Sequence, residues 1–218
     1  MTRLFFPRLL CVAALTLAGG CSALRPASTP QPVFYSLDHG QVPGRVMRMA
    51  APAAPTLIVN PPRAASGFDS PRIIYVRTAH KLEYFTQSEW VDTPARMLAP
   101  LVVAALENSG AFRAVVSNAG AAAGDLRLDT EILNLQQEFG SAPSKTHFVL
   151  RAHLVDNRTR RVLAWREFDG SVAATSEDAY GGVVAANAAV QDVLAQLAAF
   201  CADGARTWHP RAAGDSRE

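Results

Sequence analysis

Side chains that could do chemistry occur along this 218-residue chain, but their spacing matches no catalytic or metal-binding motif. The sequence contains no HExxH, GxSxG, GxGxxG or CxxC pattern and no P-loop. His147 and His153 are expected on one strand face, yet a rise of about 3.3 Å per residue puts them roughly 20 Å apart. The remaining histidines are His39, His80 and His209. We therefore expect no catalytic residue, no metal site, no cofactor and no enzymatic activity.

One cysteine, Cys21, lies where a covalent modification is expected. It ends the segment LTLAGGC, which follows a positive region with Arg3 and Arg8 and an apolar run over residues 9–18. That run is too short to cross a bilayer, because a spanning helix needs roughly 20 apolar residues. A charged start, a short apolar run and small residues at its end are typical of a cleavable secretory signal, here residues 1–20.

The residues Ala18-Gly19-Gly20-Cys21 resemble a lipobox, the motif cut by the lipoprotein signal peptidase. The resemblance implies cleavage between Gly20 and Cys21 and a diacylated Cys21 at the new N-terminus. Ser22 follows the cysteine, and a residue other than Asp at this place implies sorting to the outer membrane of a diderm bacterium, with the acyl chains in its lipid. The alternative is an ordinary secretory signal in which the cysteine occurs by chance.

The mature chain is nearly neutral and has no partner for an internal disulfide. Loss of Arg3 and Arg8 leaves 19 Lys and Arg against 19 Asp and Glu, so charge gives no argument for binding nucleic acid. Cys11 leaves with the signal and Cys21 is expected to be acylated. Cys201 then remains as a single thiol, which we interpret as a small buried hydrophobic residue.

Composition divides the chain into four parts. Residues 1–20 are the expected signal peptide, and residues 21–32 are a proline-rich, lipidated tether. At about 3.1 Å per residue, an extended tether of this length reaches on the order of 30 Å. Residues 33–202 are expected to form one domain, and residues 203–218 a disordered tail.

The hydrophobic pattern of the domain changes between the strand period and the helix period. Strands are expected at residues 33–37, 56–60, 72–77, 81–86, 112–116, 126–132, 145–155 and 162–172, and helices at residues 93–108 and 177–202. Several strands follow one another along the chain, and each has one polar face. This pattern predicts an α+β fold, in which a mainly antiparallel sheet has two helices packed on one face. The expected core includes Phe148, Leu150, Leu154, Val190, Leu194 and Leu197.

Start and stop signals set the expected helix bounds. Thr93 followed by Pro94 predicts the start of the first helix, and Gly110 its end. Pro100 should kink this helix or delay its start. Ser176 is the expected capping residue of the second helix.

Aromatic side chains around the expected hairpin are either core or a binding surface. Tyr84 and Phe85 must face opposite sides of their strand, so one of them belongs to the core. Tyr84 and Trp90 are our candidate contacts to a partner protein. If both are buried, the candidate surface is instead the polar sheet face with His147, Arg151 and His153.

Several segments in a fixed order resemble one known family, the ABC-type transport auxiliary lipoproteins, which accompany MCE-type intermembrane lipid transporters. After Cys21 these segments are YSL at residues 35–37, FDSPRIIYVR at residues 68–77, and ARMLAPLVVAALENSGAFRAVV at residues 95–116. The resemblance covers about residues 33–200. It implies a membrane-anchored, non-enzymatic partner of a transporter whose permease and ATPase are in the inner membrane, and a periplasmic MCE-domain protein as the direct partner.

Two other hypotheses stay open at this point. The chain could itself carry a lipid in an apolar pocket, or it could serve another outer-membrane assembly machine. A cavity of several hundred Å³ favours the first, because a lipid-sized ligand requires one. The sequence leaves open the transported lipid, the direction of transport and the oligomeric state, a homo-oligomer included.

The lipobox generates a direct test. Cells labelled with a clickable palmitate analogue should yield a labelled wild-type protein and an unlabelled Cys21→Ala variant, because the thiol of Cys21 is the attachment point. Cys201→Ala is the matched control and should stay labelled. Equal labelling of wild type and Cys21→Ala, measured by in-gel fluorescence, would end the lipoprotein hypothesis.

Overall fold

The computed structural model describes residues 31–38, 51–117 and 124–209. The expected signal peptide, its cleavage site at Gly20 and Cys21, and the tether up to residue 30 lie outside the described residues. The chain divides into two compact units, Met1–Gln31 and Pro32–Glu218, and the second of these contains every helix and strand of the described residues.

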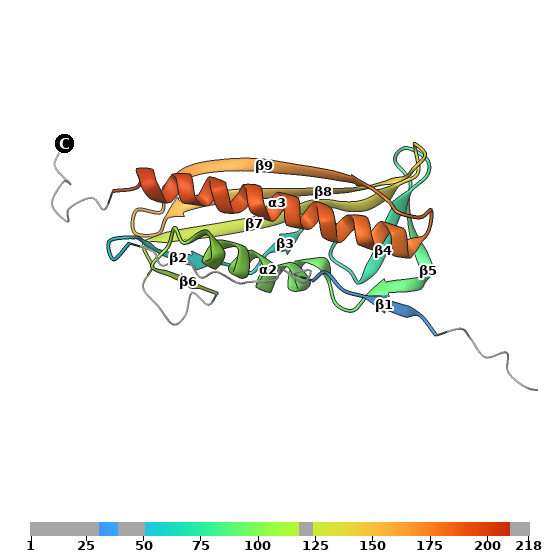
Figure 1. The fold of residues 1–218 in the computed structure, drawn as a ribbon, viewed down its shortest axis with the longest axis horizontal. Coiled ribbons are helices and arrows are strands. Elements are labelled where there is room, and N and C mark those ends of the chain that lie inside the picture. The colour runs from blue at the N-terminus through green and yellow to red at the C-terminus, as the bar shows by residue number, and fades with distance from the viewer. Residues whose placement is uncertain (1–30, 39–50, 118–123, 210–218) are drawn as a thin grey trace, which may run out of the picture. The chain divides into compact units, whose positions relative to one another are not determined.

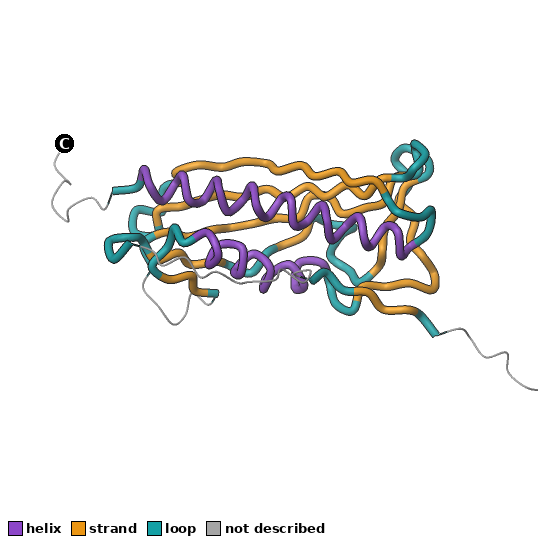
Figure 2. Tube along the Cα trace, viewed as in Figure 1, coloured by secondary structure: helices purple, strands orange, loops and turns teal. Residues whose placement is uncertain are grey.

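The described part of this unit is an α+β fold with two helices and a nine-stranded sheet (Figures 1 and 2). In chain order, its elements are β1 (Val33–Tyr35), β2 (Thr56–Val59), β3 (Arg63–Ala64), β4 (Arg72–Val76), β5 (Leu82–Trp90), α2 (Pro94–Ser109), β6 (Ala114–Val116), β7 (Leu126–Glu138), β8 (Lys145–Asp156), β9 (Val162–Ala173) and α3 (Ala179–Thr207). The expected strands and helices are therefore present, and β5 and β7 extend beyond their predicted ends.

Strand β7 is the centre of the sheet. One of its edges pairs with β8, which pairs with β9, and its other edge pairs with β2, β3 and β4. β6 pairs with β2, β5 pairs with β4, and β1 pairs with β5. Pairs β4–β5, β7–β8 and β8–β9 are antiparallel, and the other pairs are parallel.

The prediction of a mainly antiparallel sheet is therefore wrong, because the sheet is mixed. Strand β2 shows why the parallel pairs are stable. All of its residues, TLIV, are buried between β6 and β7. A short apolar run without alternation is typical of a strand covered on both faces, as parallel strands are.

The core is formed where α3 meets β8 and β9. Phe148, Leu150 and Leu154 of β8 belong to the same buried cluster as Val190, Leu194 and Leu197 of α3, as predicted. In Figure 1, α3 runs along β8 and β9.

Two glycines let the helix and the sheet approach closely. A Cβ at Gly170 of β9 would lie 2.9 Å from Cγ2 of Val193 and 3.1 Å from the carbonyl oxygen of Ala189. A Cβ at Gly204 of α3 would lie 2.3 Å from Cδ2 of Leu154. Real Cβ atoms essentially never lie within 3.0 Å of another heavy atom, so a larger residue at either position would force its neighbours to shift.

Helix α3 differs from its prediction at both ends. Its N-cap is Asp178, not Ser176: the Asp178 carboxylate accepts a 2.8 Å hydrogen bond from the Gly181 amide. Ser176 instead donates its hydroxyl to Asp178. The helix continues to Thr207, so residues 203–207 are helical and not part of a disordered tail.

The last helical turn is fixed by the residue after it. The indole of Trp208 donates a 3.0 Å hydrogen bond to Oδ2 of Asp156, at the end of β8. Burial raises the pKa of Asp156, but hydrogen bonds from Thr159, Trp208 and Arg158 outweigh it and lower the pKa. The carboxylate therefore stays charged and connects the end of α3 to the β8–β9 turn.

Helix α2 agrees with its prediction. It begins at Pro94 and ends at Ser109, Gly110 is its C-cap, and Pro100 does not delay its start. Thr93 is the N-cap by position, but its side chain makes no capping hydrogen bond. Its carbonyl accepts the amides of Arg96 and Met97.

Helix α3 is long and apolar enough to cross a membrane, judged by length and composition alone. The buried apolar side chains of α3 nevertheless belong to the core cluster of the domain, together with those of β8 and β9. Such helices are also common in the cores of globular domains. We therefore describe α3 as a core helix.

The contact between α3 and the sheet can be tested with one substitution. Leu194→Ala should lower the free energy of unfolding by about 2–5 kcal/mol, because it leaves a cavity in the buried cluster. Urea denaturation of the folded protein measures this change. Leu163→Ala is the matched control: this β9 leucine is 43% exposed, so its loss should change stability by about 0.5 kcal/mol or less. Equal effects of the two substitutions would show that α3 is not packed on the sheet.

Candidate interaction surface

The polar side chains of β7, β8 and β9 form a charged surface on the sheet. Side chains alternate along each strand, so the residues opposite Phe148, Leu150 and Leu154 point away from the core. We call this surface the polar sheet face and define it by Glu131, Glu138, His147, Arg151, His153, Trp165, Glu167 and Asp169.

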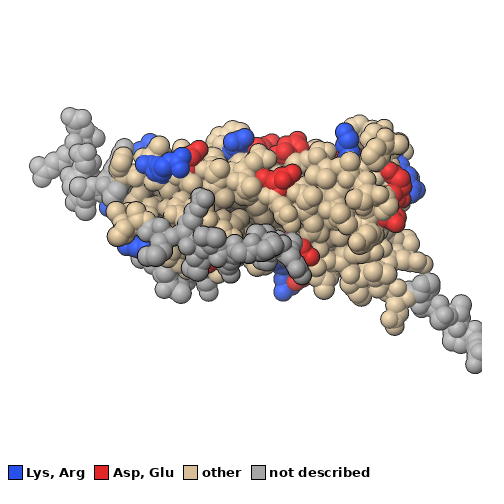
Figure 3. All heavy atoms as spheres, in the orientation of Figure 1, with Lys and Arg blue, Asp and Glu red and all other residues tan. Residues whose placement is uncertain are grey.

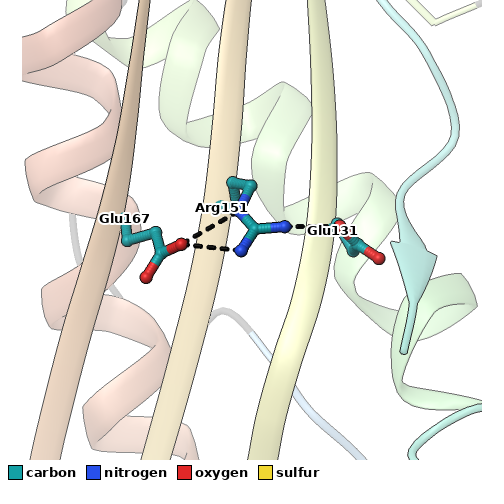
Figure 4. A network of polar contacts seen from close by, with 3 residues as sticks. All are labelled: Glu131, Arg151 and Glu167. Carbon is teal, nitrogen blue, oxygen red and sulfur yellow. Dashed lines mark hydrogen bonds and ion pairs between the residues drawn. The ribbon is translucent and has the colours of Figure 1, made fainter. Parts of the chain in front are cut away.

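Arg151 lies at the middle of this face. By register it is directly between Glu131 of β7 and Glu167 of β9, and Figure 4 shows its guanidinium pointing at both carboxylates. Nε and Nη2 donate to one oxygen of Glu167, at 3.0 Å and 2.7 Å, and Nη1 donates to Glu131 at 3.3 Å. One cation thus joins three strands.

The two carboxylates set the electrostatics of this group. The hydrogen bond from Arg151 to Glu167 is the main reason why the pKa of Arg151 lies above its ordinary value, with a further contribution from Glu131. Arg151 is therefore a permanent positive charge between two acids. Arg151, Glu131 and Glu167 together form a first row across the three strands, and this row carries an excess of one negative charge.

A second row is centred on His147. Its Nε2 lies 2.7 Å from Oδ1 of Asp169, and its Nδ1 lies 3.4 Å from Oε1 of Glu138. Among the described residues, no group of three His, Cys, Asp or Glu side chains could hold a metal ion. The row is therefore a polar link between strands β7, β8 and β9.

A third row carries an exposed aromatic residue. The indole of Trp165 stacks on His153, with ring centroids 6.3 Å apart and an interplanar angle of 25°. Trp165 is 63% exposed. A large exposed aromatic beside paired charges is the kind of residue that anchors protein–protein contacts.

The structure separates the two aromatic residues proposed as partner contacts. Trp90 is only 3% exposed and belongs to the core cluster, so its proposed role as an exposed contact does not fit the structure. The physical reason is that β5 extends to Trp90, which places this residue inside the sheet and its side chain in the core.

Tyr84 remains available for contact. It is 47% exposed, and the Arg72 guanidinium lies over its ring at 4.2 Å. Tyr84 pairs with Ile74, and Ile74 pairs with Gln136, the β7 neighbour of His147. By register, Tyr84 is therefore on the same side of the sheet as the polar sheet face.

His147, Arg151 and His153 were predicted as a second possible surface, and they do share one face of the sheet. Trp165 and Glu167 were not predicted, although they are directly across from His153 and Arg151, and neither was Asp169, which is directly across from Val149. The signal was present in the sequence: the turn DNRTR joins two alternating strands, and a hairpin register aligns their polar sides.

A small cavity lies on the helix side of the sheet. Its lining includes Trp90, Gln137 and Ala186, and its volume is about 10 Å³. The amide oxygen of Gln137 is buried there without a hydrogen-bond partner among the described residues, while its Nε2 donates to Ser144. This space is that of one water molecule, not of a lipid.

Comparisons with known proteins give the family and the fold. The chain matches the family of the ABC-type transport auxiliary lipoprotein component over residues 35–198. No curated protein sequence is significantly similar to it.

Solved structures of similar fold cover most of the chain. A Xanthomonas campestris protein solved as a member of DUF330 is 25% identical, with a TM-score of 0.67, and the match covers 80% of this chain and 97% of that one. A hypothetical protein from Chlamydia trachomatis, 10% identical over 70% of this chain and 98% of that one, has a TM-score of 0.51 and shows the fold alone. With the family matched over most of its length, the chain belongs to the ABC-type transport auxiliary lipoprotein components.

Proposed function

We propose that this protein is a lipid-anchored docking subunit of an ABC/MCE-type transport system that moves phospholipids or other lipids between the inner and outer membranes. The family match over residues 35–198 carries this proposal. In it, acyl chains on Cys21 hold the protein at the periplasmic face of the outer membrane. The protein acts by contact and not by turnover.

The direct partner in this proposal is the periplasmic MCE-domain protein, and the polar sheet face is its docking surface. Helix α3 packs on the opposite side of β8 and β9, which leaves Arg151 and its neighbours free for contact. Rows of paired charges fix the register of a partner, and the exposed rings of Trp165 and Tyr84 supply contact area.

The cavity described above, among the residues that the structure describes, gives no support to a lipid-carrying role. Pockets that enclose drug-sized ligands measure roughly 300–1,000 Å³. The cavity beside Trp90 and Gln137 is smaller by more than an order of magnitude. The packed contact of α3 with the sheet at Gly170 leaves no slack there for an acyl chain.

The proposed location depends on the residue after the lipidated cysteine. Ser22→Asp should move the protein from the outer-membrane fraction to the inner-membrane fraction, because an acidic residue there retains lipoproteins in ordinary sorting. Ser22→Ala is the matched control and should leave the distribution unchanged. Sucrose-gradient fractionation with immunoblotting measures both. An unchanged distribution of Ser22→Asp counts against outer-membrane sorting.

The docking surface can be tested by partner capture from detergent-solubilised envelopes. Trp165→Ala should weaken capture of the MCE-domain protein roughly 30-fold or more, since an anchor residue contributes about 2 kcal/mol or more. Tyr84→Ala and Arg151→Ala should weaken it as well. Tyr180→Ala is the matched control, because this exposed tyrosine lies on α3, away from the polar sheet face.

Circular dichroism spectra should confirm that each variant is folded. Full capture by folded Trp165→Ala, Tyr84→Ala and Arg151→Ala proteins would show that the polar sheet face is not the docking surface. Loss of capture by Tyr180→Ala alone would move the surface to α3.

A further inference from the structure

Exposed apolar side chains gather beside the first strand of the domain. Val33 and Phe34 of β1 are 52% and 59% exposed, and Tyr180 and Val184 of α3 are 59% and 37% exposed. These residues are far apart in the sequence and belong to the first strand and to the start of the last helix. We call this group the apolar end.

Direct contacts hold the two parts of the apolar end together. The ring of Tyr35, between them, lies 6.4 Å from that of Tyr180, centroid to centroid. Tyr180 and Val184 are four residues apart and therefore on one side of α3. The Asn187 side chain then donates to the Ser36 carbonyl at 3.2 Å and accepts the Asp38 amide at 2.9 Å. The strand and the helix are thus fixed to each other, with Val33 and Tyr35 on the Tyr180 side of β1 and Phe34 on its other side.

Charge does not explain this surface. Figure 3 shows mostly uncharged side chains around β1, and acidic side chains at the end of the domain where α3 begins. The nearby acids are used inside the domain: Asp178 accepts the Gly181 amide at 2.8 Å, and Glu177 accepts the Ser144 amide at 2.8 Å. A patch of this type favours an uncharged apolar layer over an anionic surface.

Chain length places a membrane within reach. Val33 follows the expected lipidated Cys21 after eleven intervening residues. An extended segment of that length reaches on the order of 30 Å, so the apolar end can touch the bilayer that holds the acyl chains. Other exposed apolar residues, such as Leu163 and Trp165, lie near the opposite end of β9.

We propose that the apolar end binds the surface of the membrane that carries the lipid anchor, with Val33, Tyr180 and Val184 entering the headgroup region of zwitterionic phospholipids. Aromatic and aliphatic side chains partition into this region. The contact adds a second attachment to the acyl chains and fixes which side of the domain faces the lipid. The inference rests on the lipid anchoring proposed above.

The test uses the acylated mature protein in phosphatidylcholine–phosphatidylethanolamine vesicles that contain a headgroup-level spin-labelled lipid. An NBD fluorophore on Val184→Cys should be quenched at least two-fold by the spin label. The same fluorophore on Leu163→Cys, an equally exposed aliphatic position in β9, should be quenched little. Labelling is selective, because Cys201 is buried and burial raises the pKa of its thiol to about 12.

Two further measurements distinguish lipid contact from self-association and from binding to charged lipid. Quenching should persist when the protein is diluted among vesicles at constant lipid, and when salt rises from 50 to 500 mM, since no cation of the apolar end is involved. Val33→Ser together with Tyr180→Ser should reduce the quenching at residue 184 while the protein stays with the vesicles. Tyr180→Cys serves as a second label site if Val184→Cys does not fold.

Several outcomes would overturn the inference. Equal quenching at residues 184 and 163 would mean random collision with the bilayer, and quenching lost on dilution would mean contact with a second copy. Quenching lost at high salt would mean binding to charged lipid. A protein that floats with the vesicles yet shows no quenching at residues 184 or 180 refutes the membrane contact alone, whereas a protein that does not float refutes the anchoring itself.

Discussion

The whole sheet depends on hydrogen bonding along both edges of β7. Every other strand of the described residues reaches the sheet through it, either directly, as β2, β3, β4 and β8 do, or through one of these four. A strand of 13 residues spans about 44 Å at 3.4 Å per residue, long enough to hold β2 and β4 one after the other on one edge. Its alternation fixes which side chains meet α3 and which form the polar sheet face.

The fold could be predicted from the sequence only as far as local patterns determine it. Alternation in β7, β8 and β9 predicted the strands and their buried faces, because a period of two is visible in one segment. It does not reveal the direction of a neighbour that is about 70 residues away, such as Leu57 beside Leu126, so the mixed sheet was missed. The prediction of the N-cap of α3 failed for a similar reason. Ser176 and Asp178 are both good capping residues, and only the position at which the helix begins in the structure selects Asp178.

The residues of the candidate surface were predicted only in part. His147, Arg151 and His153 were placed on one face correctly, because they are separated by even numbers of residues along one strand. Trp90 was misplaced, because the length of β5 was underestimated and a residue assigned to a loop is in fact in the sheet. The pairing of Arg151 with both Glu131 and Glu167 needs the registers of two hairpins at once, which no single segment contains.

The position of α3 after all the strands has a consequence for how the domain forms. Synthesis delivers β8 and β9 before residues 179–207, so Phe148, Leu150 and Phe168 have no helix to cover them until those residues emerge. Folding is then completed by a segment that closes contacts far apart in sequence, a slow step during which apolar strands are open to aggregation. The hydrogen bond from Trp208 to Asp156 can form only after α3 has been synthesised, since it joins the end of α3 to the turn that follows β8.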